Sequence, residues 1–223
     1  MYEFVYKLKT DYSFRSVIFG LGSLLTSVFM GILNLLLGII KHADWNFAIA
    51  VFYFIFIILR FTVFLIEYLI KNKTEEEKKQ IRYNTFLFYG LVLIILDLSL
   101  SYPISLTYYK EKSIYTNTII AIAFAAYTTM RLAIAVTNLK KTHNIEKYSL
   151  SIRTLKIISF TQALVSLITF QNVMILTFGS YDHSLKIISI IFNGIVVAII
   201  LIITILMIRS GIKYRKIQKE LSN

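Results

Sequence analysis

Six long apolar runs, separated by short polar stretches, divide the chain into regular segments. Each run is longer than the roughly 20 apolar residues that a helix needs to cross the hydrocarbon layer of a bilayer. With approximate ends, the predicted spans are residues 16–40, 46–70, 85–107, 116–139, 155–178 and 186–208. The pattern predicts an all-α polytopic membrane protein, a six-transmembrane-helix bundle that forms a single integral membrane domain over residues 1–223.

The segments outside the spans carry most of the basic residues. Segment 1–15 alternates aromatic and basic residues, which is typical of a segment lying at the lipid headgroups, and the tail 209–223 is basic. Of the 24 lysines and arginines, 18 lie in or beside the N-terminal segment, the loops after the second and fourth spans, and the tail. Four lie in or beside the opposite loops. This bias predicts that both termini are cytoplasmic.

The composition agrees with a membrane protein. Hydrophobic residues make up 57% of the chain and charged residues 16%, against roughly a quarter charged in a soluble domain. A net charge of +12 would indicate nucleic-acid binding in a soluble protein. Here the basic residues flank the spans, so we expect contact with anionic lipids and no nucleic acid. The absence of cysteine excludes disulfides and thiolate metal sites, and we expect no metal and no cofactor.

Three charged residues interrupt the apolar runs themselves: Arg60, Asp97 and Arg131. A charge in mid-span costs roughly 2.5–3.5 kcal/mol on insertion scales, so each should face protein or a water-filled cavity. Counted from the span ends at about 1.5 Å per residue, all three are expected about 12–16 Å from the cytoplasmic boundary. Glu67 lies on the same helix face as Arg60 and nearer the cytoplasm. We therefore expect the rest of the bundle to form a shell around these charges.

The charges allow three interpretations. An Arg–Asp–Arg bridge would fix the register of the helices, with Glu67 extending toward the surface. Alternatively, Asp97 neutralises one arginine and the other binds an anion, such as a lipid phosphate or a carboxylate, with its planar guanidinium. In the third interpretation Asp97 is part of a proton relay.

Polar residues accompany these charges on neighbouring faces. Ser101 follows Asp97 by one helical turn, and Pro103 predicts either a simple kink or a broken helix of the kind that forms ion and solute sites. The fifth span carries a polar stripe that must point inward, formed by Ser159, Gln162, Ser166, Thr169 and Asn172. The first span carries a ridge of small residues, predicted to pack closely against another helix, formed by Ser23, Ser27 and Gly31.

These residues favour a small-solute or ion transporter or channel-like protein with an intramembrane site. The predicted ligand-binding residues are Arg60, Asp97, Arg131, Glu67, Gln162 and Ser101. The alternative is a non-transporting membrane subunit (an immunity, sensor or scaffold protein) that binds anionic lipid, a partner membrane protein or a second copy of itself. No hydrolase, zinc-protease or nucleotide-binding motif is present, so we predict no catalytic residues.

The segment Leu167–Gly179 and the final span ending in Met207-Ile208-Arg209 resemble the C-terminal half of small six-span membrane proteins of Gram-positive bacteria. The spans around Arg60 and Arg131 are similar to them as well. This resemblance implies no activity. It implies a bacterial plasma membrane as the setting.

Overall fold

The computed structural model describes residues 12–40, 42–109, 118–141, 150–178 and 183–222. Within these ranges the chain forms helices only: α2 (Tyr12–Ile40), α3 (Asp44–Leu69), α4 (Glu75–Ser99), α5 (Ser101–Tyr109), α6 (Thr118–Lys141), α7 (Leu150–Phe178) and α8 (His183–Ser222). The all-α prediction is confirmed. Most of the predicted interfacial segment 1–15 lies outside the described residues.

Six helical segments are long and apolar enough to cross a membrane, with α4 and α5 together forming the third. They are Gly20–Ile40, Asp44–Leu69, Glu75–Ser105, Ala121–Leu139, Leu150–Ile175 and Ile187–Tyr214. Large apolar side chains such as Ile58, Phe61 and Ile95 are exposed on the outside of the bundle, as lipid contact requires. The chain is therefore a multi-pass membrane protein, as predicted.

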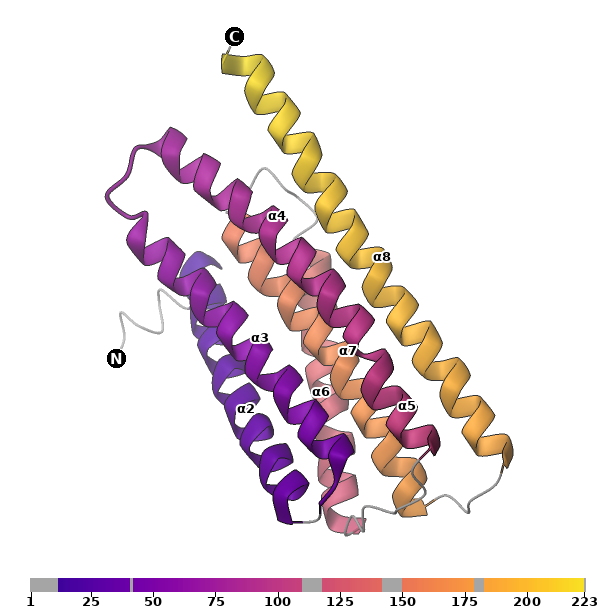
Figure 1. Ribbon diagram of the computed structural model, residues 1–223. Helices are drawn as coiled ribbons and strands as arrows, with labels where there is room; N and C mark the ends of the chain where they lie inside the picture. The colour runs from indigo at the N-terminus through magenta and orange to yellow at the C-terminus, as the bar shows by residue number, and fades with distance from the viewer. Residues whose placement is uncertain (1–11, 41, 110–117, 142–149, 179–182, 223) are drawn as a thin grey trace, which may run out of the picture.

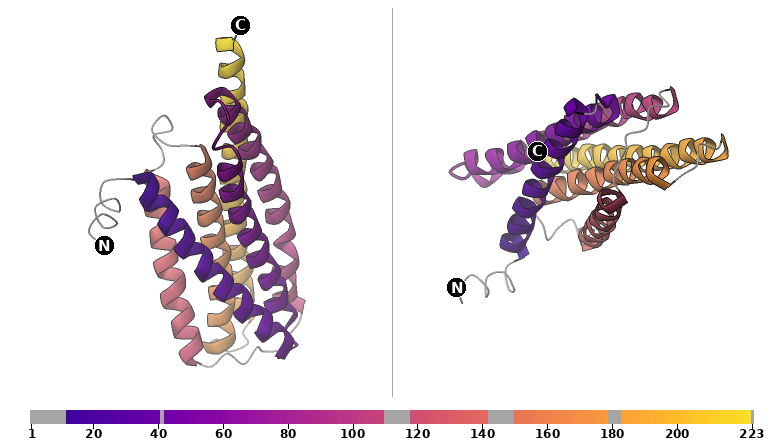
Figure 2. Two further views of the ribbon diagram at one scale, coloured as in Figure 1. Left: turned by 90° about the vertical axis from the view of Figure 1, so that its left-hand side faces the viewer. Right: turned by 90° about the horizontal axis from the view of Figure 1, so that it is seen from below.

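Consecutive spans run in opposite directions, so the beginning of α2 and the end of α8 lie at the same end of the bundle (Figure 1). α2 packs mainly on α3, α6 on α7, and α4 on α8. Helix α7 stands at the centre and also contacts α2, α3, α4 and α8 (Figure 2). At the end of the bundle near the C-terminus, α8 extends past the other helices (Figures 1 and 2).

The central position of α7 explains its polar stripe. Gln162, Ser166, Thr169 and Asn172 are all buried, and Ser159 is half-buried. Because five helices surround α7, these side chains face protein instead of lipid, where an unpaired polar group would be costly. The prediction that this stripe points inward is confirmed.

Small residues bring α2 and α3 close together. A Cβ atom added to Gly31 would lie 3.3 Å from Tyr53 Cβ, and one added to Gly38 would lie 2.9 Å from the backbone nitrogen of Phe47. The turn between the helices is a Schellman motif, in which Ala43 N–H donates to Gly38 O and His42 takes a left-handed conformation with φ of 49°. The predicted packing role of the small-residue ridge holds at Gly31.

The third span is interrupted at Leu100, between α4 and α5. Pro103 has no N–H, and its ring crowds the carbonyl of Ser99 one turn earlier. Leu100 N–H lies 3.1 Å from Leu96 O and 3.2 Å from Asp97 O, which is a shared bond typical of an irregular turn. Leu100 itself keeps helical dihedral angles, so the chain continues from α4 into α5 without unwinding, three residues after Asp97.

Candidate functional site

Arg60 of α3 is one of the most buried side chains in the bundle, with 1% of its surface exposed. Its Nη1 donates to Ser23 Oγ at 2.8 Å and to Ser27 Oγ at 3.2 Å. Both serines belong to the small-residue ridge of α2, so their short side chains leave room for a guanidinium between the two helices. The close packing of α2 on α3 thus fixes one end of Arg60.

Arg131 of α6 reaches the same place from the other side and is 8% exposed. Its Nη2 donates to Ser27 Oγ at 3.2 Å, and its Nη1 donates to the Tyr127 hydroxyl. Its guanidinium carbon lies 5.6 Å from the ring centre of Tyr127 and 6.0 Å from that of Tyr53. These distances are within the range of cation–π attraction, so two aromatic rings stabilise this charge.

The hydroxyl of Ser27 joins the two arginines. It accepts from Arg60 and Arg131, and it lies 3.1 Å from Gln162 Oε1 on α7. We call Ser23, Ser27, Arg60, Arg131 and Gln162 the double-arginine cluster. Its residues come from α2, α3, α6 and α7. A hydrogen bond between α3 and α7 lies beside it, with the Tyr53 hydroxyl 2.9 Å from Ser166 Oγ.

The double-arginine cluster has positive charge and no acidic partner among the described residues. Glu67 and Glu75 pair with Arg82 and Lys78 instead. Within the same described part, Arg60 Nε, Arg60 Nη2 and Gln162 Nε2 are buried and make no hydrogen bond. All three are donors, and such groups are costly to leave unpaired. The cluster therefore combines two guanidiniums with three buried donors that have no partner in the described part of the chain.

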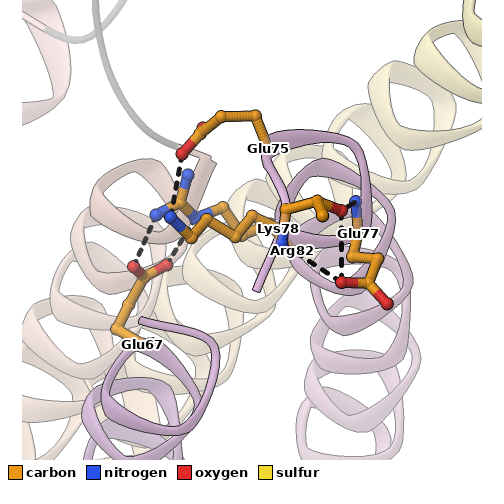
Figure 3. A network of polar contacts seen from close by, with 6 residues as sticks. Glu67, Glu75, Glu77, Lys78 and Arg82 are labelled. Atoms are coloured by element: carbon orange, nitrogen blue, oxygen red, sulfur yellow. Dashed lines mark hydrogen bonds and ion pairs between the residues drawn. The ribbon is translucent and has the colours of Figure 1, made fainter. Parts of the chain in front are cut away.

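Nε and Nη2 form one edge of a guanidinium, the edge that grips a planar anion with two parallel hydrogen bonds. Arg82 uses this edge on Glu67, with both N–O distances at 2.7 Å (Figure 3). In Arg60 the same edge has no partner among the described residues. The Arg82–Glu67 pair thus displays, within the same chain, how a carboxylate fits the edge that Arg60 presents.

Glu67 was predicted to share the site with Arg60, and the structure places it elsewhere. Its carboxylate binds Arg82 of α4 and accepts a hydrogen bond from the Ser151 hydroxyl of α7. Figure 3 shows this pair beside the α3–α4 turn, where Thr74 caps α4 by accepting from the Glu77 amide. Glu67 therefore joins three helices near the end of the bundle and does not neutralise Arg60.

Asp97 also lies apart from the arginines. Its Oδ2 is 3.1 Å from the Thr204 hydroxyl of α8, and its Oδ1 has no partner among the described residues. The predicted Arg–Asp–Arg bridge is wrong, because Asp97 faces Thr204 of α8 and makes no ion pair with Arg60 or Arg131.

Ser101 is exposed, and its hydroxyl donates to Leu98 O at 2.8 Å. The structure therefore does not bring Ser101 to Asp97, although one helical turn separates them in sequence. Of the six predicted site residues, it brings together Arg60, Arg131 and Gln162. No group of three or more acidic or histidine side chains that could hold a metal ion is present in the part of the chain that the structure describes.

Four residues around the arginines were not among the predicted ligand-binding residues: Ser23, Ser27, Tyr53 and Tyr127. A signal existed for each. Tyr53 and Tyr127 precede their arginines by seven and four residues, spacings that place them on the same helix face. The serines were interpreted as packing residues, since small side chains on an apolar helix serve both purposes.

The chain matches no protein-family model, no curated protein and no solved structure. The resemblance to six-span proteins of Gram-positive bacteria therefore stays a prediction. What the protein does has to be argued from its own side chains.

Proposed function

We propose that the protein binds a small oxyanion, of the carboxylate or phosphate class, on the double-arginine cluster and moves it across the membrane. The observation that carries this proposal is the buried Nε–Nη2 edge of Arg60, which has no partner among the described residues. A bidentate anion satisfies both donors at once, and charge-assisted bonds of this kind are about twice as strong as neutral ones.

The charge balance of the cluster supports the same proposal. Two guanidiniums bind one serine hydroxyl, and the nearest groups around them are hydroxyls, an amide and aromatic rings. In an interior of low dielectric, two positive charges repel each other strongly unless an anion lies between or beside them. Gln162 Nε2 adds a third donor for such an anion.

The position of the cluster fits transport. It lies between α2, α3, α6 and α7, inside helices that are long enough to cross a bilayer. In this proposal the protein resides in a bacterial plasma membrane with both termini in the cytoplasm, as the distribution of lysine and arginine predicts. Arg60 and Arg131 bind the anion, Gln162 orients it, and Ser23 and Ser27 hold Arg60 in place.

A second candidate is a non-transporting subunit that holds an anionic lipid or a partner on the same arginines. It is favoured by the exposure of α2 and α6, which border the cluster and have fewer buried residues than α7. A lipid phosphate would reach the arginines from the bilayer between these two helices. Both candidates use Arg60, and they differ in whether the anion crosses.

Two assays separate these candidates. Thermal unfolding of the protein in detergent is measured with inorganic phosphate, acetate, sulfate or short-chain phosphatidylglycerol, and uptake of radiolabelled phosphate and acetate is measured in proteoliposomes. Transport predicts that a soluble anion raises the melting temperature and accumulates in the vesicles. Lipid binding predicts a shift with phosphatidylglycerol alone and no uptake.

Arg60→Met and Arg131→Met should abolish the shift, whereas Arg209→Met should keep it, since Arg209 is exposed on α8. If no anion or lipid stabilises the wild type, or if Arg60→Met keeps the full shift, the proposed binding site is wrong. The Arg209→Met control shows whether loss of any arginine has the same effect.

A further inference from the structure

A buried carboxyl group lies between α4 and α8, apart from the double-arginine cluster. Asp97 of α4 is 1% exposed and faces Thr204 of α8, which is fully buried. Around them lie the apolar side chains of Leu93, Leu100 and Ile200, all fully buried or nearly so. A carboxyl group in such surroundings needs either a cation or a proton, because an isolated carboxylate there is very costly.

No cation faces Asp97 from the described parts of the helices that pack on α4. On α8 the nearest charged residue in sequence is Arg209, which is exposed and more than one turn beyond Thr204. Along α7, the described residues between Lys156 and Phe178 include no charged residue, and α5 contributes Tyr102, which is 61% exposed. The titratable residue of α3 nearest this depth is Tyr53, whose hydroxyl is bonded to Ser166.

The Thr204 hydroxyl has two oxygen neighbours and one proton to offer them. Thr204 Oγ1 lies 2.9 Å from Ile200 O, one turn earlier on its own helix, and 3.1 Å from Asp97 Oδ2. A hydroxyl has one proton to donate. If that proton goes to the shorter contact with Ile200, the Thr204 oxygen is free to accept a hydrogen bond, which a protonated Asp97 can donate and a carboxylate cannot.

We infer that Asp97 is a proton-binding site, held in this structure as the neutral carboxylic acid that donates from Oδ2 to Thr204. Release of the proton breaks the O–H bond, leaves its electron pair on Oδ2 and transfers the proton to water. The resulting carboxylate has Thr204 as its one donor among the described residues, and it shares that donor with Ile200. Ionised Asp97 therefore disfavours the close packing of α4 on α8 seen here.

The interruption at Leu100 is the point in the third span where release of the Asp97 proton can change the structure. Asp97 lies three residues before it, on the helix that Pro103 weakens. A proline is a common site of helix bending, so α5 can tilt here without unwinding α4. If the double-arginine cluster carries an anion, as proposed above, Asp97 is then the residue that carries the accompanying proton, and its protonation state selects between packed and loosened arrangements of α4, α5 and α8.

Infrared spectroscopy of the protein in lipid tests the proton directly, since a protonated carboxylic acid has a C=O stretch that a carboxylate lacks. At neutral pH the wild type should show this band and Asp97→Asn should not. Glu67→Gln is the matched control and should keep the band, because Glu67 is bound to Arg82. Thr204→Val should keep the band and shift it to higher frequency, because the acid then loses its acceptor.

Absence of the band from the wild type, its persistence in Asp97→Asn, or an unchanged frequency in Thr204→Val would overturn the assignment. Raising the pH should remove the band reversibly, and a band that resists every pH at which the protein stays folded would exclude proton exchange. Asp97→Asn should retain the thermal shift given by inorganic phosphate. If inorganic phosphate gives no thermal shift in the wild type, the proposed anion site is wrong, and the proton site at Asp97 is not affected by that result.

Discussion

Replacing Arg60 with methionine should barely change the stability of the protein, although the residue is almost completely buried. The guanidinium makes hydrogen bonds to Ser23 and Ser27, each worth about 1.5–3 kcal/mol for a charged donor. It also buries two donors without partners among the described residues, each costing about 1–3 kcal/mol. The losses and gains nearly cancel, and removing Arg60 also relieves its repulsion with Arg131, so we expect the free energy of unfolding to fall by no more than about 1 kcal/mol.

Arg82→Met is the matched control for this substitution. Arg82 makes two bonds of 2.7 Å to Glu67, and the side chains of the pair are 24% and 31% exposed. Its removal leaves a partly buried carboxylate with Ser151 as its remaining partner, which we expect to cost about 3 kcal/mol. Because 1 kcal/mol corresponds to about 2–4 °C for a chain of this length, the melting temperature should fall by about 10 °C.

Thermal unfolding of the two variants in the same detergent, without added anions, measures this difference. We expect Arg60→Met to melt within about 3 °C of the wild type, as 1 kcal/mol implies, and Arg82→Met to melt far earlier. If Arg60→Met melts as early as Arg82→Met, then Arg60 is a structural residue like Arg82. The argument that its free edge is reserved for a ligand would then be refuted.

Three further substitutions and one control test the fold. Gly38→Ala should lower the melting temperature and the free energy of unfolding by about 1–3 kcal/mol, because the added Cβ would meet the backbone of Phe47. Gly22→Ala on the same helix is the control. A Cβ there has nothing within 4 Å, so this substitution should be neutral or slightly stabilising. His42→Gly should stabilise by about 1 kcal/mol, since glycine adopts the left-handed conformation without strain, and an unchanged or lower melting temperature would contradict this. Thr74→Ala removes the cap of α4 and should cost about 1 kcal/mol in the same assay, whereas no loss would mean that water replaces the cap.

The number of spans and the inward face of α7 could be read from the sequence because both depend on local periodicity. Residues that repeat every three or four positions share a helix face wherever the helix is placed. The polar stripe around Gln162 was therefore predictable, and so was the effect of Pro103, which acts on its own helix.

The partners of the charged residues could not be predicted, because they depend on which helices pack together. Asp97 was expected to lie beside the arginines because its estimated depth in the membrane was similar. In the structure it faces Thr204 of α8 instead. Glu67 met Arg82 on the next helix instead of Arg60 on its own. Both outcomes follow from the pairing of α4 with α8 and from the α3–α4 turn, which no single-helix pattern encodes.

The central position of α7 also bears on how the protein is made. This helix is synthesised after α2, α3, α4 and α6, so its polar stripe enters a membrane in which four of its five neighbours are already present. The α2–α3 hairpin is complete earlier, and Arg60 then already has Ser23 and Ser27 beside it. Chains that stop before α7 lack Gln162 and Ser166, and they are left with an open, polar-lined half-bundle. Insertion of the fifth span is therefore the step that brings Gln162 to Ser27 and Ser166 to Tyr53.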